Sequence, residues 1–273
     1  MADWTPDDIP WQDFDSAKVD AELLRLAKAA SLIEFNSGDY TTYLCNVFHD
    51  DARFQKAVRN WQTEEVQHGR VLAMWAKLAD PSFDFDRSFK TFIEGFRVPL
   101  DAAQSVRGSR AAELIARCLV ETGTHTYYSA LADATEEPVF KAICRRIAAD
   151  ERAHYALFHR YLDRYQEKEQ LNLWQRIRVA VARISETQDD ELAYAYYAAN
   201  VAETGRSYDR RENARAYSST ALSFYRPQHR ARIADMFFEA VGLSTTHGPA
   251  RFFAAVLRAV IGLYVRSLRN APA

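Results

Sequence analysis

Apolar and small residues recur every three to four positions along four long stretches of the chain, which is the spacing of one buried face of an α-helix. Residues that favour helix starts precede these stretches: Asp15 or Ser16, Asp50 or Asp51, Ser109, and Glu137 followed by proline. The stretches cover about residues 16–48, 51–80, 109–132 and 137–167. We therefore expect an all-α protein built on four long helices.

The link between the second and third stretches, residues 81–108, is too long for a direct turn and holds two prolines and two glycines. A long connection at this place is typical of ferritin-like four-helix bundles. Further helices are expected near residues 171–187, 189–204, 209–224, 227–241 and 248–268, with Gly205 and Gly242 as helix ends. The sequence thus predicts one all-helical domain over residues 1–273, with a four-helix core at 16–167 and a C-terminal extension at 168–273.

Composition agrees with the predicted helical fold, and the distribution of charge bears on the kinds of partner that the protein would bind. Of the 273 residues 48% are hydrophobic, and only nine are glycine and eight proline, which suits long helices around a large core. The net charge is −2, and no nucleic-acid partner is expected. Residues 170–273 nevertheless hold 14 arginines and nine acidic residues. This basic third would suit an acidic carrier protein or anionic lipid, although a solvated arginine-rich face is the commoner cause of such a bias.

Three further features concern location. Cys45, Cys118 and Cys144 show no CxxC spacing, so neither a disulfide framework nor a rubredoxin-type site is expected. The first 15 residues are acidic and lack the regions of a secretory signal, which leads us to expect a cytoplasmic protein. The most apolar segment, residues 249–268, is interrupted by three arginines, so we expect an amphipathic or packed helix, with peripheral membrane contact as an alternative.

Two Glu-x-x-His motifs carry the candidate chemistry: Glu65 with His68, and Glu151 with His154. Residues three apart on a helix point the same way, so each motif offers a carboxylate and an imidazole on one face. Composition alone predicts about 0.4 such pairs in this chain. Two are found, and each lies within an apolar stripe, where charged side chains are costly unless they are paired or bind metal.

Each motif also has a glutamate on the preceding helix. Glu34 lies 31 residues before Glu65, and Glu121 lies 30 residues before Glu151. The four carboxylates and two imidazoles are the ligand set of ferritin-like di-iron and di-manganese bundles, and four carboxylates balance the charge of two divalent cations. We therefore predict a di-metal site of Glu34, Glu65, His68, Glu121, Glu151 and His154. Surface salt bridges are the alternative explanation.

Two neighbours of these ligands suggest oxygen chemistry. Thr124 lies one turn after Glu121, where its hydroxyl would reach a metal-bound oxygen species; an ordinary bond to a helix carbonyl is the alternative. Asp150 precedes Glu151, and its carboxylate would accept a hydrogen bond from the second ring nitrogen of a ligand histidine across the bundle. The alternative is an exposed aspartate without this role.

The sequences TEEVQHG at residues 63–69 and IAADERAH at residues 147–154 resemble the two signatures of soluble acyl-carrier-protein desaturases, TEE-x-x-HG and IAADE-x-x-H. Glu121 to Thr124 is similar to the E-x-x-T of the same family, and Glu34 matches its first ligand by position. His125 has no place in the family pattern. The resemblance covers about residues 30–160.

The resemblance implies O2-dependent removal of two hydrogens from an acyl chain bound as a thioester to acyl carrier protein or coenzyme A. It implies two irons held by the six ligands, Thr124 assisting oxygen activation and Asp150 bound to His68. It also implies a ferredoxin-type external electron donor and a homodimer. A manganese–iron pair, other oxidations such as hydroxylation, deformylation or N-oxidation, iron or peroxide handling of the ferritin or rubrerythrin type, and a non-catalytic helical scaffold remain alternatives.

Overall fold

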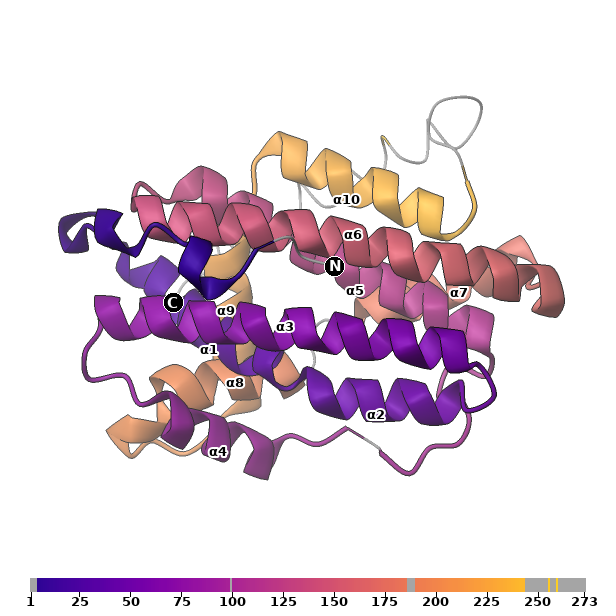
Figure 1. Ribbon diagram of the computed structural model, residues 1–273, viewed down its shortest axis with the longest axis horizontal. Coiled ribbons are helices and arrows are strands. Elements are labelled where there is room, and N and C mark those ends of the chain that lie inside the picture. The colour runs from indigo at the N-terminus through magenta and orange to yellow at the C-terminus, as the bar shows by residue number, and fades with distance from the viewer. Residues whose placement is uncertain (1–3, 99, 186–189, 244–254, 256–258, 260–273) are drawn as a thin grey trace.

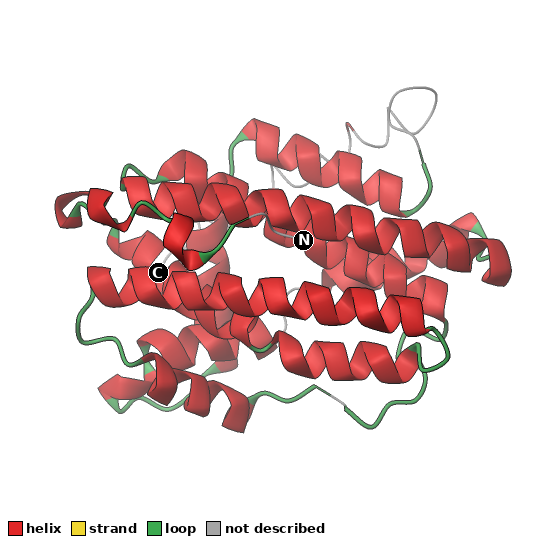
Figure 2. Ribbon diagram, viewed as in Figure 1, coloured by secondary structure: helices red, strands yellow, loops and turns green. Residues whose placement is uncertain are grey.

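The structure, a computed structural model, describes residues 4–98, 100–185, 190–243, 255 and 259. These residues form helices joined by loops, with no strand among them (Figure 2). The all-α prediction is therefore confirmed. Apart from two isolated positions, the helix expected at 248–268 lies outside the described residues.

Two pairs of long helices form the bundle (Figure 1). The helix α1 (Ala21–Phe35) packs along α3 (Ala52–Ala79), and α5 (Arg110–Ala134) packs along α6 (Pro138–Glu169). Contacts between α3 and α6 join the pairs. The link from α3 to α5 carries the short helix α4 (Phe85–Gly95), which lies against α1. This link is the predicted long crossover.

The predicted first helix was wrong in one respect, because residues 16–48 do not form one continuous helix. They form a 3₁₀ turn (Ser16–Lys18), α1, and α2 (Ser37–Val47), with a break at Asn36. Asp15 caps only the turn, while Asp20 caps α1. Asn36 is followed by Ser37 and Gly38, two weak helix formers, which favours an interruption. Glu34 consequently lies in the last turn of α1, directly before the break.

The other predicted starts agree with the structure. Asp51 and Ser109 cap α3 and α5 through bonds from backbone amides. Glu137 caps α6 by accepting from the backbone amides of Val139 and Phe140. Gly205 and Gly242 both follow helices with a φ of 77°, a conformation that favours glycine.

Up to residue 243, the described part of the chain adds four further helices around the bundle: α7 (Leu173–Ser185), α8 (Asp190–Asn200), α9 (Arg210–Ser223) and α10 (Pro227–Ala240). The helices α7 and α10 pack on α5, whereas α8 and α9 pack on α1. Of the helices in the described part of the chain, none combines the length and apolar character that a membrane crossing requires.

The apolar core of the bundle is divided by a polar layer. One cluster contains Leu26, Trp75 and Phe140 toward one end, and a second contains Trp61 and Phe158 toward the other. The predicted ligands occupy the positions between these clusters on all four bundle helices. Apolar packing therefore flanks the site on both sides and excludes water from it.

Candidate metal centre

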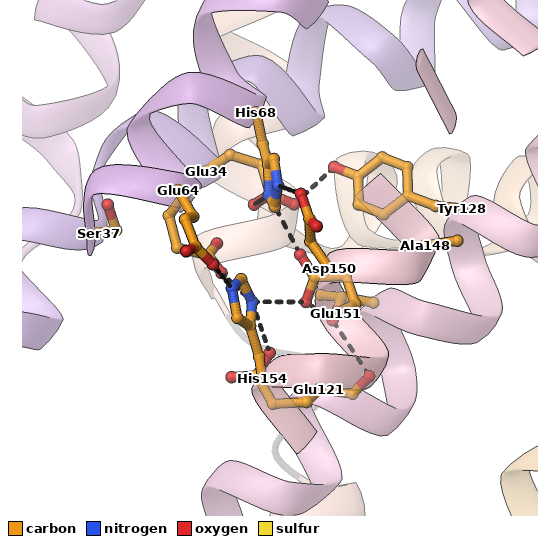
Figure 3. A network of polar contacts seen from close by, with 12 residues as sticks. Glu34, Ser37, Glu64, His68, Glu121, Tyr128, Ala148, Asp150, Glu151 and His154 are labelled. Carbon is orange, nitrogen blue, oxygen red and sulfur yellow. Dashed lines mark hydrogen bonds and ion pairs between the residues drawn. The ribbon is translucent and has the colours of Figure 1, made fainter. Parts of the chain in front are cut away.

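The six predicted ligands come together inside the bundle. Figure 3 labels all of them except Glu65. They form two groups that share Glu65 and Glu151, and within each group the candidate ligand atoms lie within 4.8 Å of one another. We call the group with Glu34 and His68 site A and the group with Glu121 and His154 site B; all six residues are buried. Glu65 and Glu151 stand where carboxylates would bridge two metals.

A close approach of α1 and α3 brings Glu34 to His68. A side chain at Gly69 would lie 2.7 Å from the backbone nitrogen of Phe35 and 2.9 Å from the carbonyl oxygen of Ser31. Only glycine allows the two helices this separation. The glycine that follows His68 in the motif therefore has a direct role in placing two ligands of site A together.

Both histidines present Nδ1 to the centre. In site A, Nδ1 of His68 lies 3.6 Å from Oε2 of Glu34 and 3.3 Å from Oε1 of Glu151. In site B, Nδ1 of His154 lies 3.0 Å from Oε1 of Glu65 and 3.8 Å from Oε2 of Glu121.

The outward nitrogens are held by carboxylates from the opposite motif. Nε2 of His68 lies 3.0 Å from Oδ2 of Asp150, and Nε2 of His154 lies 2.8 Å from Oε2 of Glu64. A carboxylate at Nε2 fixes the proton there and leaves Nδ1 free for a metal.

When no metal is bound, the acids of the site would compete for protons. Burial, together with the charge of Glu151, raises the pKa of Glu65 well above its usual value. The same causes raise the pKa of Glu121 to about 8. Burial acts against the charged form of Glu151 too, but the attraction of the adjacent His154 and His68 rings outweighs it and brings the pKa of Glu151 well below its usual value. The site thus holds four buried carboxylates but only two histidines, which are too few to balance the negative charge of the carboxylates.

The unsatisfied atoms test whether a metal fits. Within the part of the chain that the structure describes, five inward atoms are buried without a hydrogen-bond partner: Oε2 of Glu34, Oε1 of Glu65, Nδ1 of His68, Oε1 of Glu151 and Nδ1 of His154. Such atoms are costly in a protein interior unless something binds them. Oxygen and imidazole donors at these positions fit two iron or manganese ions. That they bind metal stays a prediction.

Thr124 and Asp150 both lie at the site. The Thr124 hydroxyl donates to Oε2 of Glu151 at 2.5 Å, although carbonyl oxygens of its own helix also lie 3.3 Å away. Asp150 is buried, and besides His68 it accepts from Nε1 of Trp4 at 2.7 Å. His125 instead contacts the carbonyl oxygen of Ala148 at 2.7 Å, and thus links α5 to α6.

Sequence reasoning missed four residues that contact the site. Glu64 precedes Glu65 as Asp150 precedes Glu151, so the symmetry of the motifs was a usable signal. Tyr128, one turn after Thr124, donates to Oε1 of Glu34 at 2.5 Å. The other two are Arg117, which binds Glu121 from one turn earlier on α5, and Trp4, for which the sequence offered no signal.

The fold and the site define a helical bundle with a buried carboxylate–histidine centre. A sequence model described as fatty acid desaturase matches residues 39–178, about half of the chain, so the protein belongs to the fatty acid desaturase family. No match was found among curated proteins. The match covers five of the six predicted ligands, all but Glu34, and supports an oxidoreductase with desaturase-like activity.

Proposed function

We propose that the protein is an O2-dependent di-iron desaturase that introduces a double bond into a fatty acyl chain carried as a thioester. The observation that carries this proposal is the set of unpartnered inward atoms, which α1, α3 and α6 contribute to one centre; all its candidate ligands except Glu34 lie within the desaturase match. The reaction would take one O2, two electrons, two protons and a –CH2–CH2– unit, and yield –CH=CH– and two water molecules.

The chain would hold one iron at Glu34 and His68, the other at Glu121 and His154, and bridge them through Glu65 and Glu151. When bound, the two irons supply O2 activation and the oxidation of C–H bonds. Asp150 and Glu64 keep the imidazole protons on Nε2, so that the Nδ1 atoms face the metals. The apolar clusters on either side exclude water from the oxidant.

Thr124 would hold a proton at the edge of the centre. Its Oγ1 lies 2.5 Å from Oε2 of Glu151, and the residue is only half-buried. A hydroxyl in this place can hold a proton beside Glu151, release it toward the centre and be reprotonated from solvent. We therefore assign Thr124 to proton delivery during O2 activation.

The partners in this proposal are an acyl carrier protein or coenzyme A as the acyl carrier, and a ferredoxin-type protein as electron donor. The basic C-terminal third favours an acidic carrier, and the three cysteines show no spacing suited to an iron–sulfur or rubredoxin centre. The homodimer and the cytoplasmic location stay predictions.

The test is product analysis with reduced ferredoxin, O2 and a panel of saturated acyl thioesters on both carriers. We expect a product two hydrogens lighter that requires both O2 and reductant and is lost in Glu151→Ala. A product with an added oxygen atom would indicate hydroxylation instead. Iron-loaded protein that leaves the whole panel unchanged would contradict the desaturase assignment, and an iron core in assembled cages would favour storage.

A further inference from the structure

The outermost carboxylates of the two sites are bound by different donors. Oε1 of Glu34 accepts from the Tyr128 hydroxyl at 2.5 Å, and Oε1 of Glu121 accepts from Nη2 of Arg117 at 3.2 Å. In each case the other oxygen, Oε2, faces the Nδ1 atom of the site's histidine. The two glutamates thus have matching geometry, but one is bound by a neutral phenol and the other by a cation.

Arg117 is held inside the protein. Its side chain is 9% exposed, and its guanidinium carbon lies 5.4, 5.2 and 5.6 Å from the ring centroids of Tyr40, Trp61 and Phe158. Contacts with three aromatic faces stabilise a buried guanidinium and fix its position. The positive charge therefore stays beside Glu121 and is only weakly screened by solvent.

The charge of Arg117 has one direct counterpart. Among the described residues, Glu121 is the carboxylate with which it forms an ion pair. Glu113 lies one turn earlier on α5, but its carboxylate is bound by the hydroxyls of Tyr43 and Ser105, each at 2.7 Å.

The remaining surroundings of the two sites are balanced. Each histidine has one carboxylate at Nε2, Asp150 for His68 and Glu64 for His154, and both sites share the same bridging pair. Arg117 is consequently the charge that distinguishes site B from site A. A fixed cation close to a metal site repels a divalent ion that enters it.

We propose that Arg117 makes the two metal sites unequal: site A takes the first divalent cation, and site B takes the second with lower affinity. Arg117 also holds Oε1 of Glu121, which leaves Oε2 to face the centre. Unequal sites would allow two different metals to be loaded in order.

This inference rests on the metal centre of the proposed function, not on its substrate. The test is anaerobic titration of full-length, metal-free protein with Co²⁺, followed by visible absorption and calorimetry. We expect two steps of one equivalent each, with the second about tenfold weaker or more. His154→Ala should keep the tight step, and His68→Ala should lose it.

The matched variants are Arg117→Met, which keeps the length without the charge, and Arg117→Lys, which keeps the charge. Arg117→Met should tighten the second step by about tenfold and leave the first unchanged, whereas Arg117→Lys should retain two separate steps. Equal steps in the wild type, or an unchanged second step in folded Arg117→Met, would overturn the inference while leaving the di-metal centre intact. If Arg117→Met does not fold, the order of filling is still tested, because equal steps in the wild type or loss of the tight step in His154→Ala would overturn the inference. Absence of Co²⁺ binding would overturn both the inference and the metal centre.

Discussion

Oε2 of Glu64 lies 2.8 Å from Nε2 of His154, and this contact repeats across the bundle the one that Asp150 makes with His68. Each motif thus supplies, from the position before its ligand glutamate, the carboxylate that orients the histidine of the other motif. The two motifs support one another, and neither site is complete with one helix alone.

We expect Glu64→Ala to weaken metal binding about as much as Asp150→Ala, by about 10- to 100-fold, because either change leaves a ligand imidazole without its orienting partner. Glu64→Gln should retain most of the affinity, since an amide oxygen still accepts from Nε2. Metal affinity measured by competition with a chelator checks this. Wild-type affinity in Glu64→Ala would show that the contact does not serve the metal.

Gly69→Ala should separate α1 from α3. The added methyl group would lie 2.7 Å from the backbone of Phe35, so we expect a loss of about 1–3 kcal/mol in the free energy of unfolding and weaker metal binding at site A. Gly123→Ala is the matched control, because nothing lies within 4 Å of the added atom, and replacing a mid-helix glycine should stabilise α5 slightly. Chemical denaturation of both variants makes the comparison; equal stabilities would contradict it.

Glu137 joins the start of α6 to α3. This fully buried carboxylate accepts from the backbone amides of Val139 and Phe140 and from Nε1 of Trp75 at 2.7 Å. Glu137→Ala should therefore lower the free energy of unfolding by about 2–4 kcal/mol, through the lost cap and the unpaired indole. The exposed neighbour Glu136 provides the control, and Glu136→Ala should change stability by less than about 0.5 kcal/mol.

The metal-free protein should become less stable as pH rises from about 6 to 8.5. Burial raises the pKa of Glu121 to about 8. The pKa values of His68 and His154 are also raised, because carboxylate hydrogen bonds outweigh burial. The folded state thus holds protons that the unfolded state has released over this range, and its stability falls as pH rises through the folded-state values.

Melting temperatures of metal-free protein across this range provide the measurement. Metal should abolish the decline, because ligands are then deprotonated throughout, and metal uptake near pH 7 should release protons. A melting temperature of the metal-free protein that rises toward pH 8.5 would contradict this assignment of protons.

The sequence predicted the helices and the six converging side chains because both depend on local spacing. Periodicity placed the four bundle helices, and the i, i+3 motifs placed Glu65 with His68 on one helix face. The break at Asn36 was missed because the apolar stripe continues through it. The low helix propensity of Ser37 and Gly38 was a weaker signal than the apolar stripe, but the helix is interrupted where these residues begin.

The contacts between helices were harder to foresee. Tyr128 and Trp4 reach the site only because of how the helices and the N-terminal segment pack, which a single sequence does not specify. The i, i+4 spacing of Arg117 and Glu121 could have predicted their ion pair. Charge balance alone, however, does not favour a buried arginine beside a predicted cation site.

Iron content per chain tests the central claim most directly. After anaerobic loading, elemental analysis should find about two irons in the wild type, at most one in Glu34→Ala, and almost none in Glu151→Ala, because Glu151 belongs to both sites. Glu167→Ala, which changes an exposed glutamate on the same helix, should retain two. Wild-type protein without stoichiometric iron, or Glu151→Ala that still holds two irons, would contradict the di-iron centre.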